Sequence, residues 1–156
     1  PVDVHGVTKR LESGGDIVEA ASGCRVIVDA SDNFATRFAA NDAAVEAGIP
    51  LVHGAAAGWR GQLMTILPGR SACLRCLFGE PPENGGTCHE EGVLGSVAGE
   101  VGGLMALETL KLLRGEGRPL ADRLLTLDAL SGKRRIVRLR RNPQCGVCAT
   151  GCDVTE

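Results

Sequence analysis

Two short cysteine pairs constrain the fold of this chain more than any other feature of its sequence. Each pair encloses two residues, in Cys73-Leu-Arg-Cys76 and in Cys145-Gly-Val-Cys148. Four thiolates in two such knuckles can close a tetrahedral shell around Zn²⁺, and a closed shell holds structure rather than performing chemistry. The pairs lie much further apart than the roughly 15–20 residues typical of a small zinc ribbon. A metal bound here would therefore join two distant segments of one domain.

Two other interpretations of these cysteines remain open. A Cys-x-x-Cys pair can be redox-active when the pKa of one thiol is lowered, but that motif usually occurs once and opens a helix after a strand. A disulfide framework is less compatible with an odd total of seven cysteines and with a sequence that contains no recognisable secretory signal. The repeated pair favours structural zinc, with four ligands: Cys73, Cys76, Cys145 and Cys148.

Length and composition indicate one cytoplasmic α/β domain. The chain has 156 residues, of which 44% are hydrophobic, so it can bury a substantial core. Its net charge of −2 does not favour nucleic acid as a partner, and no run is long and apolar enough for a membrane. The chain opens at Pro1 and enters a strand-like stretch at residues 2–7, so we expect it to be a fragment of a longer protein.

The first half of the chain predicts a strand–helix–strand unit. Residues 24–30 are short, β-branched and apolar, as in a parallel strand buried on both faces, and a short helix over residues 16–22 precedes them. A helix capped by Asp32 or Asn33 should run to residue 47, because Gly48 follows it. The next strand is then expected at residues 49–53, which makes the sheet parallel at this point.

The second half predicts a third strand, a mobile loop, a helix and a hairpin. The strand covers residues 61–67, and the breaker-rich loop covers residues 79–91. Residues 93–113 are apolar almost all round, which predicts a buried helix, with a groove along Gly95, Gly99 and Gly103. Strands at residues 123–128 and 133–140 should pair as a hairpin, and residues 149–156 should form a tail.

Polar residues at the end of the first predicted strand form a candidate phosphate site. Ligands bind at the carboxyl ends of strands in an open parallel sheet, and Asp32 and Asn33 stand at that end, with Arg37 one helical turn further on. Asp32 could bind Mg²⁺, while Asn33 and the free amides of the helix start meet phosphate oxygens. The spacing alone favours a purely structural role, in which Asp32 caps the helix and Arg37 pairs with an acid.

Cys88 is a candidate nucleophile outside both knuckles. It lies beside His89 and shortly before the long helix, and both features can lower the pKa of a thiol. Glu90 and Glu91 oppose this effect, so a plain loop cysteine is the alternative. Of the other thiols, Cys24 is expected in the core and Cys152 in the tail. The basic run at residues 133–141 is expected to form a solvated face of the hairpin, although it could meet an acidic partner.

Taken together, the motifs resemble the ThiF/MoeB/HesA family of E1-like activating enzymes. The resemblance covers almost the whole chain and is specific because the motifs occur in the family's order and spacing. The matching segments are residues 29–37, 54–62, 73–76, 87–95, 106–111 and 142–148. It implies a Rossmann-like E1 fold, truncated at its N-terminal side, in which residues 1–148 form the C-terminal part of one activating domain.

The resemblance also implies an activity and its partners. Members of this family use ATP and Mg²⁺ to adenylate the C-terminal Gly-Gly of a ubiquitin-like sulfur carrier of the ThiS or MoaD type. A sulfur donor then converts the adenylate to a thiocarboxylate, in pathways such as thiamine or molybdopterin biosynthesis. By match to the family motif, Asp32 would bind Mg²⁺, with Asn33 and Arg37 lining the nucleotide. Cys88 falls where some members carry a carrier-linking cysteine, the knuckle cysteines match structural zinc ligands, and homodimers are common.

One departure from the family pattern is large. The Gly-x-Gly-x-x-Gly turn that cradles phosphates occurs nowhere before Asp29, so we expect this chain alone to be inactive. The alternative function is a catalytically silent, zinc-stabilised module that binds a partner protein through the basic hairpin and the loop around Cys88. A nicotinamide-dependent oxidoreductase is less compatible, because it needs the same missing turn and gives no reason for zinc.

Overall fold

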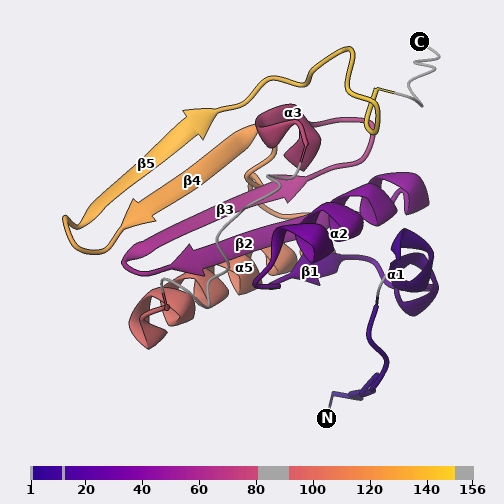
Figure 1. Cartoon of the computed structure of the whole chain (residues 1–156), viewed down its shortest axis with the longest axis horizontal. Coiled ribbons are helices and arrows are strands. Elements are labelled where there is room, and N and C mark those ends of the chain that lie inside the picture. The colour runs from indigo at the N-terminus through magenta and orange to yellow at the C-terminus, as the bar shows by residue number, and fades with distance from the viewer. Residues whose placement is uncertain (1, 12, 81–91, 150–156) are drawn as a thin grey trace.

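The computed structural model of the chain describes residues 2–11, 13–80 and 92–149 and is built on one mixed sheet (Figure 1). Its five strands lie in chain order: β1 (Ile27–Asp29), β2 (Leu51–Ala57), β3 (Arg60–Ile66), β4 (Arg123–Asp128) and β5 (Lys133–Arg138). β1 and β2 are parallel, and the other neighbours are antiparallel. The prediction of an α/β fold with a parallel-to-mixed sheet and a C-terminal hairpin is confirmed.

The predicted strand–helix–strand unit is present and is bounded by the expected signals. Helix α2 (Phe34–Ala47) joins β1 to β2. Asn33 is its N-cap, with a side-chain oxygen that accepts a 2.8 Å hydrogen bond from the backbone N–H of Thr36. Gly48 ends the helix in a left-handed conformation at φ 68°, which glycine adopts without steric cost. Helix α1 (Gly14–Ala20) packs against α2, and Ser13 caps it.

Helices cover both faces of the sheet. Helix α5 (Gly95–Arg114) packs on β2 and β3 from one side, while α2 and the short helix α3 (Leu74–Phe78) lie on the other. The approach of α5 is close because two strand positions are glycines. A Cβ at Gly54 would lie 2.3 Å from Sδ of Met105, and one at Gly61 would lie 2.6 Å from Cγ2 of Val101. Larger residues at these strand positions would push the helix off the sheet.

Three predictions about the N-terminal part and β1 are wrong. Residues 2–10 have no regular structure, and Val2 and Val4 are 88% and 83% exposed. β1 is shorter than residues 24–30 and is not buried on both faces, because Val28 is 49% exposed. Cys24 is exposed rather than in the core. Within the described residues β1 is an edge strand with β2 as its one strand neighbour, which leaves this part of the chain more open than a central strand would be.

The prediction that the long helix is buried holds for one side only. Val97, Val101 and Met105 of α5 face the sheet, whereas Leu107 and Leu110 are 56% and 51% exposed. Sequence showed an apolar helix but not which side would find a partner. The expected groove along Gly95, Gly99 and Gly103 has no atom within 4 Å of an added Cβ, so no described segment fills it. None of the described helices is long and apolar enough to span a membrane.

Candidate functional site

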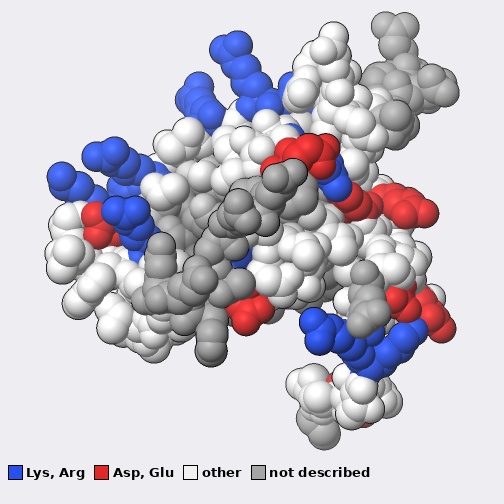
Figure 2. Space-filling model, in the orientation of Figure 1, with Lys and Arg blue, Asp and Glu red and all other residues white. Residues whose placement is uncertain are grey.

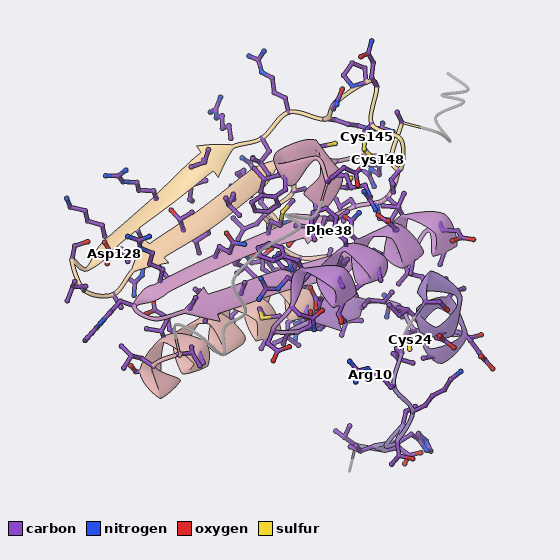
Figure 3. The ribbon with its side chains drawn as sticks, in the orientation of Figure 1. Arg10, Cys24, Phe38, Asp128, Cys145 and Cys148 are labelled. Carbon is purple, nitrogen blue, oxygen red and sulfur yellow. The ribbon has the colours of Figure 1, made fainter. Side chains whose placement is uncertain are left out.

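The four knuckle cysteines come together in space from two distant segments. Cys73 is the N-cap of α3 and Cys76 lies within that helix. Cys145 and Cys148 lie in the turns after β5 (Figure 3). The sulfur atoms of Cys73 and Cys145 are 3.7 Å apart, those of Cys76 and Cys148 are 3.4 Å apart, and those of Cys73 and Cys76 are 3.9 Å apart. All four lie within 4.8 Å of one another.

This geometry fits a tetrahedral zinc ion. Metal–sulfur bonds of about 2.3 Å place the sulfurs of a tetrahedron about 3.8 Å apart, close to the observed separations. The backbone N–H of Asn142 points to Sγ of Cys76 at 3.3 Å, a hydrogen bond that stabilises a thiolate. Burial raises the pKa of Cys145, but hydrogen bonds from the backbone N–H groups of Cys148 and Val147 outweigh it and lower the pKa to about 7. Zinc bound here would be structural, since all four of its ligands would be cysteine sulfurs and no position would stay open.

The first knuckle is fastened to helix α2 at two points. The backbone N–H of Leu74 donates a 2.9 Å hydrogen bond to Oδ1 of Asn41, whose side chain is fully buried. Arg75 binds Asp42 with both Nε and Nη2, at 3.0 Å to Oδ1 and 2.7 Å to Oδ2. Hydrogen bonding to Asp42 raises the pKa of the Arg75 guanidinium, and its Nη1 also pairs with Glu80 at 2.7 Å. The metal centre is therefore held against the helix that starts at Asn33.

The turn between β1 and α2 gathers the predicted phosphate-site residues. Asp32 is exposed, and its Oδ1 accepts a 3.2 Å hydrogen bond from Nδ2 of Asn33. Of the two caps considered, Asn33 is the one present, so the prediction that Asp32 caps the helix is wrong. Arg37 is buried, with Nε and Nη2 donating to the carbonyl oxygen of Ser31 at 3.2 and 3.0 Å. The carboxylate of Asp32 and the amides of the α2 start thus face the same end of β1.

A buried acid–base pair beneath this turn was not foreseen. Oδ2 of Asp29 lies 2.7 Å from Nδ1 of His53, and Oδ1 of Asp29 accepts from the backbone N–H and Oγ of Ser31 at 3.0 and 2.6 Å. Burial alone would raise the pKa of Asp29, but the hydrogen bonds from His53 and Ser31 lower it below its ordinary value. The parallel register sets Asp29 directly beside His53. A polar residue at the same position of two adjacent strands was the available signal.

Cys88 and the expected loop around it lie outside the described residues, as does Cys152. The metal and phosphate sites are thus the two described candidates, and both contact α2, one at its start and one along its side. Each consists of side chains from segments far apart in sequence. Only the cysteine cluster brings three or more metal-binding side chains together within the described ranges.

Comparison with known proteins places this arrangement in a family. The family model described as "ThiF family" matches residues 1–147. The chain belongs to the ThiF family. The match includes the Asp32 turn and three of the four knuckle cysteines: Cys73, Cys76 and Cys145. The prediction of a ThiF/MoeB/HesA-type chain is confirmed.

Individual relatives show how much of a ThiF protein the chain represents. It is 45% identical to the SAMP-activating enzyme E1 of Haloferax volcanii over 152 residues, which are 96% of this chain and 56% of that protein. It is 48% identical over 130 residues to the sulfur carrier protein adenylyltransferase of Thermus thermophilus, covering 79% of this chain and 48% of that protein. The chain thus spans about half the length of these two relatives.

A solved structure supports the fold. The crystal structure of E. coli MccB with ATP matches 92% of this chain and 45% of its own chain, with a TM-score of 0.76 and 18% identity. At this identity the likeness concerns the arrangement of helices and strands. The mixed sheet with its helices on both faces is therefore an arrangement shared with a solved protein.

Proposed function

We propose that the full-length protein adenylates the C-terminal Gly-Gly of a ubiquitin-like sulfur carrier of the ThiS or MoaD type. The observation that carries the proposal is the exposed Asp32 carboxylate at the carboxyl end of a parallel strand, beside the free N-terminus of α2. The names of the relatives, a sulfur carrier protein adenylyltransferase and an E1, support the same reaction class. Sulfur transfer for cofactor biosynthesis would then follow in the cytoplasm.

Each residue at the turn has a defined task in this proposal. Asp32 would hold Mg²⁺, which when bound neutralises charge on the ATP phosphates. Asn33 keeps the turn and the first turn of α2 in place, so that the backbone amides there meet phosphate oxygens. Arg37 fixes the turn through the carbonyl oxygen of Ser31. These roles concern binding and orientation of the nucleotide.

The chemistry is the transfer of an adenylyl group from ATP to a carboxylate. A carboxylate oxygen of the carrier's terminal glycine attacks the α-phosphorus of ATP, and the bond from that phosphorus to the bridging oxygen breaks. Pyrophosphate leaves with the electron pair, and the carrier becomes an acyl-adenylate. A sulfur donor would later displace AMP to give a thiocarboxylate. Cys88 is a candidate for a transient link to the carrier at that stage.

Carrier-dependent ATP–pyrophosphate exchange tests the proposal. We expect the full-length protein to catalyse exchange. The Asp32→Asn variant should lose on the order of 100-fold or more of the exchange rate, because the carboxylate that would hold Mg²⁺ beside the phosphates is gone. Asp3→Asn is the matched control, since Asp3 is equally exposed but lies in the irregular N-terminal segment. The chain alone should not catalyse exchange, because its sequence contains no Gly-x-Gly-x-x-Gly turn. No exchange by the full-length protein with any ThiS- or MoaD-type carrier would refute the proposal.

A second candidate function is a protein-binding module without catalysis. All six residues of β5 are exposed, and Lys and Arg side chains gather over the β4–β5 hairpin (Figure 2). This basic surface of the hairpin could bind an acidic surface of another protein. Salt-sensitive binding of a partner, together with no exchange by the full-length protein, would favour this function over the enzyme.

The exposed side of α5 supports a homodimer. Leu107 and Leu110 are exposed on it, and glycines such as Gly99 and Gly103 would allow a second backbone to come close. Light scattering of the full-length protein tests this part of the proposal. A Leu110→Glu variant should be monomeric if the helix forms the interface, and a wild-type protein that is already monomeric would contradict it.

A further inference from the structure

A continuous set of hydrogen bonds runs from the middle of the sheet to the turn that carries Asp32. It starts at His53 on β2, whose Nδ1 lies 2.7 Å from Oδ2 of Asp29 on β1. Both side chains are buried, at 1% and 5% exposure. With Asp29 ionised, Nδ1 is the protonated nitrogen and donates to the carboxylate. His53 therefore fixes the orientation of the Asp29 carboxyl group.

Asp29 in turn holds the backbone of the turn that leads to Asp32. Its second oxygen, Oδ1, accepts from both the backbone N–H and the hydroxyl of Ser31, at 3.0 and 2.6 Å. Arg37 holds the same residue from the opposite side, through the carbonyl oxygen of Ser31. Ser31 directly precedes Asp32, so the backbone that places the Asp32 carboxylate is held from β1 and from α2.

Packing alone does not account for a histidine at position 53. Its Nε2 is buried and has no hydrogen-bond partner, and Asp29 is the one polar partner of the His53 side chain in the described part of the chain. Leaving a buried polar group unpaired costs about 1–3 kcal/mol. The neighbouring residue on β3, Met64, shows that an apolar side chain fits this layer of the sheet. The bond from Nδ1 to Asp29 is the one feature that offsets this cost.

We propose that His53 is a positioning residue for the nucleotide-binding turn, acting through Asp29 and Ser31 on the place of the Asp32 carboxylate. This inference rests on the proposed function, because it assumes that Asp32 binds Mg²⁺ with the nucleotide. His53 does not touch the substrate. It acts like the outer residues that orient metal ligands, whose loss typically weakens metal affinity about 10–100-fold.

Two isosteric replacements of His53 separate this role from a structural one. In His53→Asn the amide nitrogen takes the place of Nδ1 and can still donate to Asp29, whereas in His53→Gln it takes the place of Nε2 and cannot. We measure pyrophosphate exchange of the full-length protein as a function of Mg²⁺ concentration, with melting temperature alongside. We expect the Asn variant to stay within about 2-fold of wild type in its half-saturating Mg²⁺ concentration, and the Gln variant to require about 10–100-fold more.

A variant at Ser31 keeps the test decisive if position 53 does not tolerate change. Ser31→Ala removes the Oγ bond to Asp29 from a half-buried side chain, so it should fold and should also raise the Mg²⁺ requirement. Ser22→Ala, an exposed serine after α1, is its control and should not. If the wild type is active and Ser31→Ala and both His53 variants share its Mg²⁺ dependence, the inference is overturned. An inactive wild type would instead refute the proposed function.

Discussion

Oγ1 of Thr65 donates a 2.7 Å hydrogen bond to Oε2 of Glu108, which joins β3 to α5 inside the protein. The same carboxylate oxygen accepts from the backbone N–H of Leu120 at 2.6 Å, and Oε1 binds Nζ of Lys111. Glu108 is only 2% exposed. One buried carboxylate thus connects the long helix, the sheet and the segment that leads into β4.

Removing this carboxylate should cost substantial stability. We expect Glu108→Ala to lower the free energy of unfolding by about 3–5 kcal/mol, because three donors lose their buried acceptor. Urea unfolding followed by circular dichroism measures the change. Glu100→Ala is the control on the same helix, since Glu100 pairs with Arg134 at the surface, and it should cost no more than about 1 kcal/mol. Equal decreases in unfolding free energy for the two variants would contradict the prediction that the buried Glu108 contacts stabilise the fold more than a surface ion pair does.

Much of this fold could be predicted because its signals are local. The cap at Asn33 and the stop at Gly48 each act within a few residues, and the structure has both. The two-residue spacing within each cysteine pair also predicted a metal site without reference to any other segment. The α2 helix and the β4–β5 hairpin were therefore placed correctly to within a few residues.

What could not be predicted depends on contacts between distant segments. Leu107 and Leu110 of α5 are exposed. The apolar pattern of a helix does not say whether another segment or chain covers such residues. The pairing of Asp29 with His53 needs the register of two strands, and a shift of one residue would turn His53 to the opposite face. The part of the site that was missed, the pair of Asp29 and His53, thus depends on strand register and not on a sequence motif.

Loss of one zinc ligand should release the metal and destabilise the part of the core that surrounds the cysteine pairs. We expect Cys145→Ser to lower the zinc content from about one ion per chain and to lower the melting temperature, since Cys73, Cys145 and Cys148 all belong to the cluster around Met64. The loss should reach several kcal/mol, because the binding free energy of a structural zinc, about 10–16 kcal/mol in small peptides, contributes to folding.

Cys24→Ser is the matched control for the zinc prediction. Cys24 is exposed and lies near α1, away from Cys145 and Cys148 (Figure 3). Its replacement should change neither the zinc content, measured by atomic emission after purification without chelator, nor the melting temperature. Wild-type protein with far less than one zinc ion per chain would contradict the assignment of the metal.

Asp29 should make the stability of the chain depend on pH. Its pKa is lower in the folded chain than the ordinary value of 3.8, so the ionised form stabilises the fold above that value. The contribution is lost as the pH falls through the folded pKa. We therefore expect Asp29→Asn to be less stable than wild type by about 1–3 kcal/mol near neutral pH. The difference should shrink in acid.

Unfolding in urea across a pH series measures this difference. Asp3→Asn serves as the control, because Asp3 is exposed and contacts only the exposed His5 among the described residues. That variant should match wild type at every pH. A gap between Asp29→Asn and wild type that stays constant down to pH values well below 3.8 would contradict the assigned direction.

Two glycines decide how closely α5 approaches the sheet, and alanine at either should destabilise the protein. The added Cβ at Gly61 would meet Val101 at 2.6 Å and Leu127 at 2.9 Å, whereas the one at Gly54 would meet mainly the flexible side chain of Met105. We expect a loss of about 1–3 kcal/mol for each variant, larger for Gly61→Ala because β-branched valine cannot move aside.

A double-mutant cycle identifies the contact responsible. Met105→Ala removes the atoms that the new Cβ would meet at Gly54, so Gly54→Ala should cost little in that background, while Gly61→Ala should cost as much as before. Gly99→Ala, on the open side of α5, is the control and should be neutral or stabilising by up to about 1 kcal/mol, because alanine favours the helix. Unfolding free energies of the single and double variants measure the coupling. Equal coupling of Met105 to both glycines would contradict the close packing that places α5 on β2 and β3.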